Sequence, residues 1–147
     1  GTQNLCRCLP GETKIATPRG EKRISELATG DTVWTADKTG KRVAAPLVAV
    51  NKVNPGDDHQ MVCIELADGR SLKATPEHPS ADENRSIDQF NIGHVIDGSS
   101  VVKKYYMPYG EPHTFDILPA GETGTYWAKG VLIGSTLSAW YKLSAKK

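Results

Sequence analysis

The sequence Cys-Leu-Pro-Gly-Glu-Thr-Lys-Ile at residues 8–15 is followed, 67 residues after its cysteine, by Thr-Pro-Glu-His-Pro at residues 75–79. Together the two stretches supply a thiol, a hydroxyl and an imidazole. These groups can rearrange the peptide bond that precedes a cysteine. The pair therefore predicts that the substrate is the protein's own backbone, at the bond between Arg7 and Cys8.

Length and composition describe an ordinary globular chain. Its 147 residues predict one domain, large enough to bury a core without a metal or disulfides. The net charge of +1 offers no electrostatic footprint for nucleic acid or an anionic membrane, so we expect neither partner. We also expect a monomer. No apolar run approaches the roughly 20 residues that span a bilayer. Three cysteines are too few for a disulfide scaffold, which leaves the redox compartment open.

Short strands separated by turns dominate the sequence pattern. The clearest hairpin joins residues 61–66 to residues 71–75 through Asp68-Gly69, a dipeptide typical of tight hairpin turns. Further strands are expected at residues 14–16, 32–35, 42–53, 100–107, 114–118 and 126–133. One helical turn is expected at residues 24–27, and helical spacing otherwise begins only at residue 137. This pattern favours an all-β domain.

A thiol can attack the carbonyl carbon of the preceding residue through a five-membered ring, which replaces the amide by a thioester and frees the cysteine amine. Because attacker and target are tethered, the entropic cost of their approach is small. The departing nitrogen still needs a proton donor, which suits His78, and the oxyanion needs hydrogen-bond donors, for which Thr75 is available. Pro76 and Pro79 stiffen the turn that carries both side chains.

Each of these residues, taken singly, also has an ordinary structural interpretation. Cys8 would be a small buried side chain, Thr75 the end of a strand and His78 a turn residue. Only their combination indicates chemistry. Cys63 is expected to be a core thiol, and the tryptophans at positions 34 and 127 are expected to be core aromatics.

Five stretches, in the family's order, resemble the sequence blocks of Hint domains, the module shared by hedgehog proteins and inteins. They are residues 8–15, 21–34, 63–79 (with its Thr-x-x-His), 114–117 and 126–132. The resemblance covers residues 8–135 and implies a compact, horseshoe-like Hint fold, all-β and in a single domain. Residues 1–7 would then be an upstream flanking segment and residues 136–147 a tail.

The resemblance also implies roles for individual residues. Cys8 would be the nucleophile, with Thr75 and His78 assisting the acyl shift. Asp116 matches a family aspartate that tunes the thiol or takes part in proton transfer, although alone it would be an exposed carboxylate at a strand end.

The departure from splicing inteins lies at the closing end. Splicing inteins end in His-Asn, and the Asn cyclises to cut the C-terminal bond, whereas this possible junction reads Gly134-Ser135. The family's additional histidine upstream is replaced near Gly124-Thr125. We therefore expect cleavage at Arg7–Cys8 through a thioester, resolved by water or a small nucleophile, without Asn-dependent splicing. This would be a single-turnover reaction on the flanking polypeptide, with no cofactor or metal, for which bacterial intein-like domains are the nearest analogy.

Other interpretations stay open. The chain would be a Hint relic that keeps the fold without the chemistry, a residual splicing element, or a Cys-His protease acting in trans, which would need an open cleft. Cys6 and Cys8 would bind a metal only with a histidine, and the Cys-x-Cys spacing is tighter than usual for zinc. Cys6 would otherwise be a redox gate, by forming a disulfide or taking over the acyl group.

The remaining histidines give no clear signal. His59 is expected to be a loop residue, and the sequence identifies no partner for His94 or His113. The compartment and the host precursor also stay open, and a secreted or cell-surface bacterial protein is compatible with the sequence.

Overall fold

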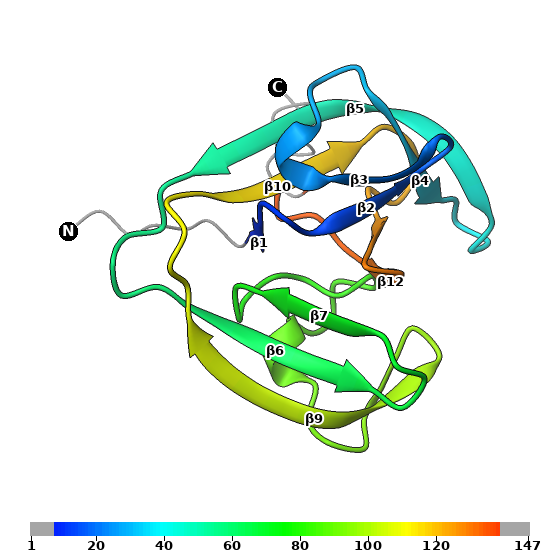
Figure 1. The fold of residues 1–147 in the computed structure, drawn as a ribbon. Coiled ribbons are helices and arrows are strands. Elements are labelled where there is room, and N and C mark those ends of the chain that lie inside the picture. The colour runs from blue at the N-terminus through cyan, green and yellow to red at the C-terminus, as the bar shows by residue number, and fades with distance from the viewer. Residues whose placement is uncertain (1–7, 139–147) are drawn as a thin grey trace.

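The computed structural model describes residues 8–138, which consist mainly of short strands (Figure 1). The strands are β1 (Leu9–Pro10), β2 (Lys14–Thr17), β3 (Gly20–Arg23), β4 (Thr32–Ala36), β5 (Arg42–Val53), β6 (Gln60–Leu66), β7 (Ser71–Ala74), β8 (Val95–Ile96), β9 (Ser99–Pro108), β10 (Thr114–Pro119), β11 (Tyr126–Ala128) and β12 (Val131–Ile133). Two 3-10 helices, η1 (Ile24–Glu26) and η2 (Ile87–Gln89), interrupt them. The expected helical turn at residues 24–27 is confirmed as η1. The helical spacing expected from residue 137 falls largely outside the described residues.

The strands form three antiparallel four-stranded sheets within the described part of the chain. Their orders are β1-β10-β5-β4, β12-β11-β2-β3 and β7-β6-β9-β8. Figure 1 shows long curved strands on either side of the molecule, β5 and β10 above and β6 and β9 below, with β1, β7 and β12 between them. The predicted horseshoe-like, all-β fold in a single domain is confirmed.

The hairpin of β6 and β7 follows the sequence closely. Its register pairs Val62 with Ala74 and Glu65 with Ser71. Gly69 has a φ of 95°, a left-handed conformation that glycine adopts without strain. Strand β6 also pairs with β9 and is buried on both faces. Cys63 on this strand is a free thiol in the core, as expected.

The strand expected at residues 126–133 is wrong, because these residues form the hairpin of β11 and β12. The chain reverses at Lys129 and Gly130, whose φ angles are 50° and 79°. Two successive left-handed residues make the tight turn that matches the twist of a hairpin. Lysine is not a typical residue for the first of these positions, which is why the sequence pattern looked continuous. The two-residue strands β1 and β8 were also not expected.

The core runs through all three sheets, and its side chains are less than a tenth exposed. It includes Leu9, Ile15, Ile24, Val33, Ile64, Leu72, Ile117, Tyr126, Val131 and Ile133. The expected core positions of Trp34 and Trp127 are wrong, because both are only partly buried. The guanidinium of Arg42 lies 5.7 Å and 4.3 Å from the ring centroids of Trp34 and Trp127, so both rings make cation–π contacts with this side chain.

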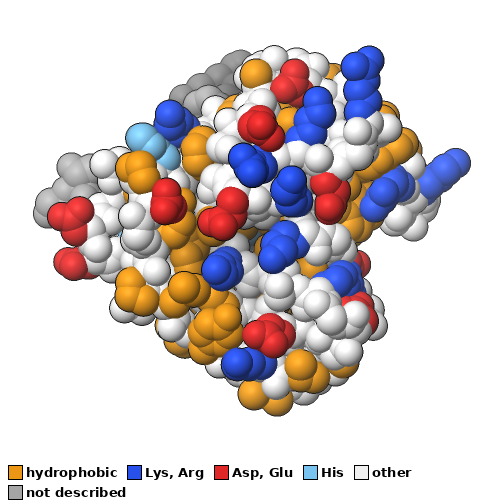
Figure 2. Space-filling model, in the orientation of Figure 1, with side chains coloured by type: hydrophobic (Ala, Val, Ile, Leu, Met, Phe, Trp, Pro, Cys, Tyr) orange, Lys and Arg blue, Asp and Glu red, His pale blue; other side chains and the backbone are white. Residues whose placement is uncertain are grey.

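Charges of both signs are interspersed on the face drawn in Figure 2, in keeping with the net charge of +1. Within residues 8–138, no helix is long and apolar enough to cross a membrane.

Gly134 follows β12 in a tight contact with the segment at residues 79–80. Its N–H donates to the Pro79 carbonyl at 3.1 Å, and a Cβ on Gly134 would lie 2.6 Å from the Ser80 carbonyl oxygen. Gly134→Ala is therefore expected to lower the free energy of unfolding by about 1–3 kcal/mol, since backbone atoms must move to relieve the overlap. Urea unfolding measures this loss.

Gly110→Ala is the matched control, because a Cβ there meets nothing within 4 Å. It is expected to change stability by less than about 0.5 kcal/mol. Equal urea midpoints for the two variants would contradict the close contact at Gly134.

Candidate functional site

The turn at residues 75–78 is the centre of the site. The His78 N–H donates to the Thr75 carbonyl at 2.9 Å, which closes the turn directly after β7. The Ile87 N–H donates to the His78 carbonyl at 2.8 Å, so η2 anchors the turn from below. Thr75 is 3% exposed and His78 is 0% exposed. Both side chains are therefore held inside the protein, not on a surface loop.

Cys8 meets this turn through its backbone. The Thr75 N–H donates to the Cys8 carbonyl at 2.9 Å, and Cys8 is 1% exposed. Strand β1 pairs with β10, Leu9 opposite Phe115, and continuing this register by one residue places Asp116 opposite Cys8. Cys8 is disulfide-bonded. The thiol must therefore be released by reduction before it can act as a nucleophile.

The carboxylate of Asp116 is completely buried and accepts three hydrogen bonds. Oδ1 accepts from the Tyr126 hydroxyl at 2.5 Å and from the Ile117 N–H at 2.8 Å, and Oδ2 accepts from the Thr136 N–H at 2.8 Å. Burial raises the pKa of Asp116, while the nearby His78 imidazole and the three hydrogen bonds oppose that shift. The interpretation of Asp116 as an exposed strand-end carboxylate is therefore wrong.

The hydroxyl of Tyr126 stays protonated, because burial and then the neighbouring Asp116 raise the pKa of Tyr126 well above its usual value. Tyr126 is therefore a permanent hydrogen-bond donor to the carboxylate.

The imidazole of His78 contacts the closing end of the domain. Nε2 of His78 lies 2.8 Å from the Gly134 carbonyl oxygen. Because a carbonyl only accepts, Nε2 carries the hydrogen in this contact. Ser135, the other junction residue, is 2% exposed, and its hydroxyl accepts from the Leu137 N–H at 3.1 Å.

The structure thus brings together most of the residues that the sequence singles out. Cys8, Thr75, His78, Asp116 and Gly134 are linked by short contacts or by strand register. Arg7 and Cys6 lie outside the described residues.

Three contributors to the site are not predicted by the sequence. They are Tyr126 and Thr136, which bind Asp116, and His59, whose Nε2 lies 3.1 Å from Thr75 Oγ1. The resemblance covers the stretch containing Tyr126 but gives no reason to single out its hydroxyl.

Hydroxyl groups cluster around Thr125, in the stretch where we expected the family's additional histidine to be replaced. Thr125 is buried, and its Oγ1 lies 2.7 Å from Thr123 Oγ1. The Thr35 hydroxyl donates to the Thr125 carbonyl at 2.6 Å. This cluster holds the loop before β11 against β4 and brings no imidazole to the site.

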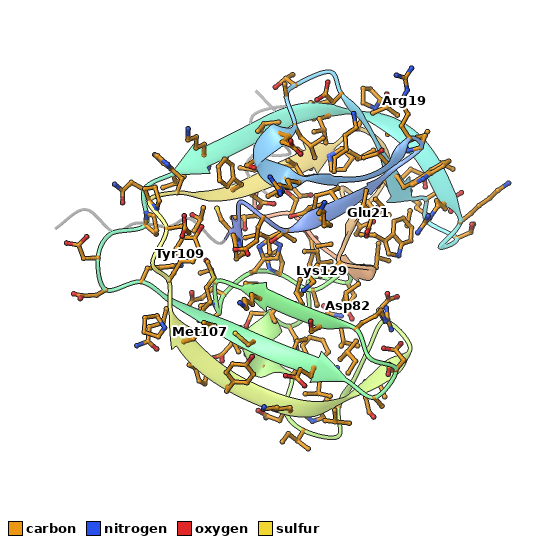
Figure 3. All side chains as sticks on the ribbon, viewed as in Figure 1. Arg19, Glu21, Asp82, Met107, Tyr109 and Lys129 are labelled. Atoms are coloured by element: carbon orange, nitrogen blue, oxygen red, sulfur yellow. The ribbon has the colours of Figure 1, made fainter. Side chains whose placement is uncertain are left out.

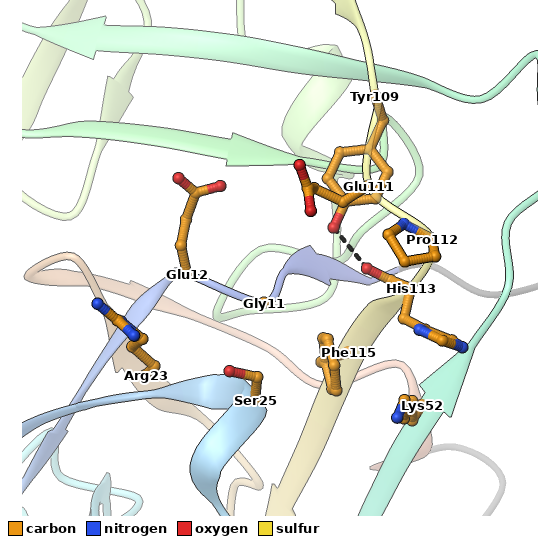
Figure 4. Close-up of a pocket in the computed structure, with 10 residues that line it drawn as sticks. All are labelled: Gly11, Glu12, Arg23, Ser25, Lys52, Tyr109, Glu111, Pro112, His113 and Phe115. Carbon is orange, nitrogen blue, oxygen red and sulfur yellow. Dashed lines mark hydrogen bonds between the residues drawn. The ribbon is translucent and has the colours of Figure 1, made fainter.

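A pocket of about 470 Å³ lies near the site and opens to solvent (Figure 4). It is lined by Gly11, Glu12, Arg23, Ser25, Lys52, Tyr109, Glu111, Pro112, His113 and Phe115. Cys8, Thr75, His78 and Asp116 do not line it. This pocket is therefore not an open cleft at the thiol, which a protease acting in trans would need.

Residues 8–138 contain no group of three or more His, Cys, Asp or Glu side chains that would hold a metal ion. His94 Nδ1 accepts from the Asn91 N–H at 2.9 Å, and His113 lines the pocket of Figure 4.

Comparison with known proteins gives a family and a fold. The family model of the Hint module matches residues 2–97. The structure is similar to a DnaB intein from Synechocystis sp., with a TM-score of 0.75 and 16% identity over 89% of this chain and 99% of that one. It is similar to a bacterial intein-like domain from Clostridium thermocellum, with a TM-score of 0.73 and 16% identity over 89% and 99%. It is also similar to the gp41-1 intein, with a TM-score of 0.69 and 22% identity over 88% of this chain and 98% of that one. At these identities the likeness is one of fold.

The bond from Tyr126 to Asp116 is expected to make stability depend on pH. With its folded-state pKa raised, Asp116 contributes most stability below the ordinary value of 3.8 and progressively less as the pH rises toward the folded value. Tyr126→Phe removes a donor to the ionised form, which raises that pKa further. The variant is expected to lose about 2 kcal/mol at pH 8 and less toward pH 4, measured by urea unfolding.

The control for this experiment is Asp116→Asn, which removes the titrating group. In that background Tyr126→Phe is expected to cost the same at every pH. If the stability cost of Tyr126→Phe does not change with pH in the protein that keeps Asp116, the charge-dependent bond is ruled out.

Proposed function

The chain belongs to the Hint module family and is in that broad sense a self-processing domain, and we propose that it cuts the peptide bond before its own Cys8 through a thioester. The observation that carries this proposal is the closed centre in which the Cys8 carbonyl, the turn at residues 75–78 and Asp116 meet. The side chains of Cys8, Thr75, His78 and Asp116 are 3% exposed or less. Such a centre suits a substrate that is already part of the chain.

The first half of the reaction exchanges an amide for a thioester. The reduced Cys8 thiol gives its proton to Asp116, and Sγ attacks the carbonyl carbon of Arg7, so that a C–S bond forms and an oxyanion develops. Thr75 stabilises the oxyanion by donating its hydroxyl hydrogen. The oxyanion collapses, the C–N bond breaks, and the nitrogen takes a proton from His78. The result is an acyl group on Sγ and a free amine on Cys8.

The second half releases the upstream segment. A water molecule attacks the thioester carbonyl and gives a proton to His78, which restores the imidazolium. The C–S bond breaks, and the departing thiolate recovers its proton from Asp116. Residues 1–7 leave with a carboxyl end, and a thiol or amine in place of water gives a thioester or an amide.

The contact of His78 with Gly134 supports its role as the acid. Nε2 donates to the Gly134 carbonyl at 2.8 Å throughout, so Nδ1 is the atom that gives up the proton. The neutral ring that remains is the Nε2–H tautomer, which the carbonyl already stabilises. Proton loss therefore needs no rotation of the ring.

The closing end supports cleavage without splicing. Neither Gly134 nor Ser135 has an amide side chain that would cyclise. A side chain at position 134 would collide with the Ser80 carbonyl, 2.6 Å from the position of a Cβ. The penultimate histidine of splicing inteins would therefore not fit this backbone.

The test uses the full chain, a phosphine reductant and hydroxylamine. The phosphine opens the disulfide at Cys8 without supplying a competing thiol, and hydroxylamine captures the thioester. Intact mass is expected to show loss of residues 1–7 as a hydroxamate only when both reagents are present. Cys8→Ala is expected to abolish cleavage, and His78→Ala to slow it about 100-fold, as for other general acids.

Cys63→Ser is the matched control, because this thiol is free, buried and on another sheet. It is expected to cleave at the wild-type rate. Unchanged cleavage in Cys8→Ala or His78→Ala would refute the mechanism, and no cleavage under any nucleophile would favour a relic. Cys6→Ser tests the interpretation of Cys6 as a redox gate. Equal cleavage rates for the wild-type chain in reducing and oxidising buffer would rule this interpretation out.

A further inference from the structure

His59 reaches the hydroxyl of Thr75 from the loop that leads into β6. The two residues are joined by the 3.1 Å contact between His59 Nε2 and Thr75 Oγ1. Strands β6 and β7 pair Val62 with Ala74, so in the same register His59 and Thr75 are diagonal neighbours on one face of the sheet. His59 lies in a loop, as expected, but its imidazole is directed to the site.

Tyr109 fixes the ring of His59 from the other side. The Tyr109 N–H donates to the His59 carbonyl at 2.9 Å. The two rings meet edge to face, with centroids 6.2 Å apart and an angle of 84°. The Tyr109 hydroxyl in turn donates to the His113 carbonyl (Figure 4). Figure 3 places Tyr109 on the segment that leads out of β9, where the upper and lower strands join. The imidazole is therefore held in one orientation.

Burial makes the neutral ring the preferred form. Burial lowers the pKa of His59, and the carboxylate of Glu77 opposes this shift only in part. A neutral imidazole has one N–H, which can be on either nitrogen. With the hydrogen on Nε2, the ring donates to one lone pair of the Thr75 hydroxyl and leaves the hydroxyl hydrogen free to donate elsewhere.

We propose that His59 is a positioning residue for the acyl shift, which donates from Nε2 to Thr75 Oγ1 and so directs the Thr75 hydroxyl hydrogen toward the oxyanion. This inference rests on the proposed function. Without His59 the hydroxyl rotates among its staggered positions and binds the oxyanion in only part of them. Loss of a direct oxyanion donor costs about 100- to 1000-fold in rate, so loss of a residue that acts through the donor is expected to cost about tenfold.

Two variants separate the hydrogen bond from packing. His59→Phe keeps an aromatic ring against Tyr109 but has no N–H, and His59→Gln places an amide N–H near the position of Nε2. Hydroxylamine cleavage of the reduced chain is expected to be about tenfold slower in His59→Phe and within about threefold of wild type in His59→Gln. Urea unfolding of both variants shows whether a slower cleavage rate comes instead from a loss of stability.

A double variant shows whether His59 acts through Thr75. In a Thr75→Val background, His59→Phe is expected to cause no further slowing. A further tenfold loss would overturn the inference, because His59 would then act elsewhere. Unchanged cleavage in His59→Phe, with cleavage still abolished in Cys8→Ala, would overturn it and leave the proposed function intact. A reduced wild-type chain that no nucleophile cleaves would instead overturn the proposed function and, with it, this role.

The tautomer gives a readout that does not need activity. In uncleaved Cys8→Ala protein, nitrogen NMR is expected to show His59 as the Nε2–H tautomer, with signals that shift in Thr75→Val. His94 is the internal reference, because its Nδ1 accepts from the Asn91 N–H away from Thr75. An Nδ1–H tautomer at His59 would contradict the proposed direction of the bond.

Discussion

Two carbonyl groups from opposite ends of the domain converge on one turn, and the site depends on this convergence. The Cys8 carbonyl accepts from the Thr75 N–H, and the Gly134 carbonyl accepts from the His78 ring. Each bond contributes about 1 kcal/mol net, but an unpaired buried partner would cost about 1–3 kcal/mol. The sheets therefore bring β1 and the end of β12 to the same turn, although more than a hundred residues separate them.

A second constraint is the buried charge of Asp116. An ionised carboxylate with no exposure is tolerated only when donors replace its lost water. The donors come from β10 itself, from β11 through Tyr126 and from the segment after β12 through Thr136. Among the residues described, no fully buried side-chain nitrogen or oxygen lacks a hydrogen-bond partner. Satisfying this charge thus also fixes the closing segment beside the thiol.

The sequence predicts the parts of the fold that have local signals. The hairpin through Asp68-Gly69 and the strand at residues 42–53 follow from turn chemistry and alternation, and the structure confirms both. The Lys129-Gly130 turn was missed because left-handed lysine has no local signature. Site residues found by sequence stand in motifs, as the residues at 75–78 do, and their roles remain predictions.

The site residues that were missed depend on how sheets pack. Tyr126 reaches Asp116 from a strand in a different sheet, and His59 reaches Thr75 diagonally across a hairpin. Neither contact has a characteristic spacing in the sequence, because the spacing is set by loop lengths and register. A Tyr or His at such positions reads as an ordinary core or loop residue until the strands are placed side by side.

The closed centre also constrains the order of events in the proposed reaction. Thiol and carbonyl are tethered, so the acyl shift needs no access from solvent, whereas capture of the thioester does. The side chains of Cys8, Thr75, His78 and Asp116 are 3% exposed or less. In the proposed reaction the amide is favoured over the thioester, so such a centre would return most of the thioester to the amide before a nucleophile enters. Release would then be governed by how easily a nucleophile reaches the acyl group, and small nucleophiles would have the advantage. Under the proposed function, a site built in this way would favour fidelity of the shift over speed of release, as a reaction that each chain performs once would allow.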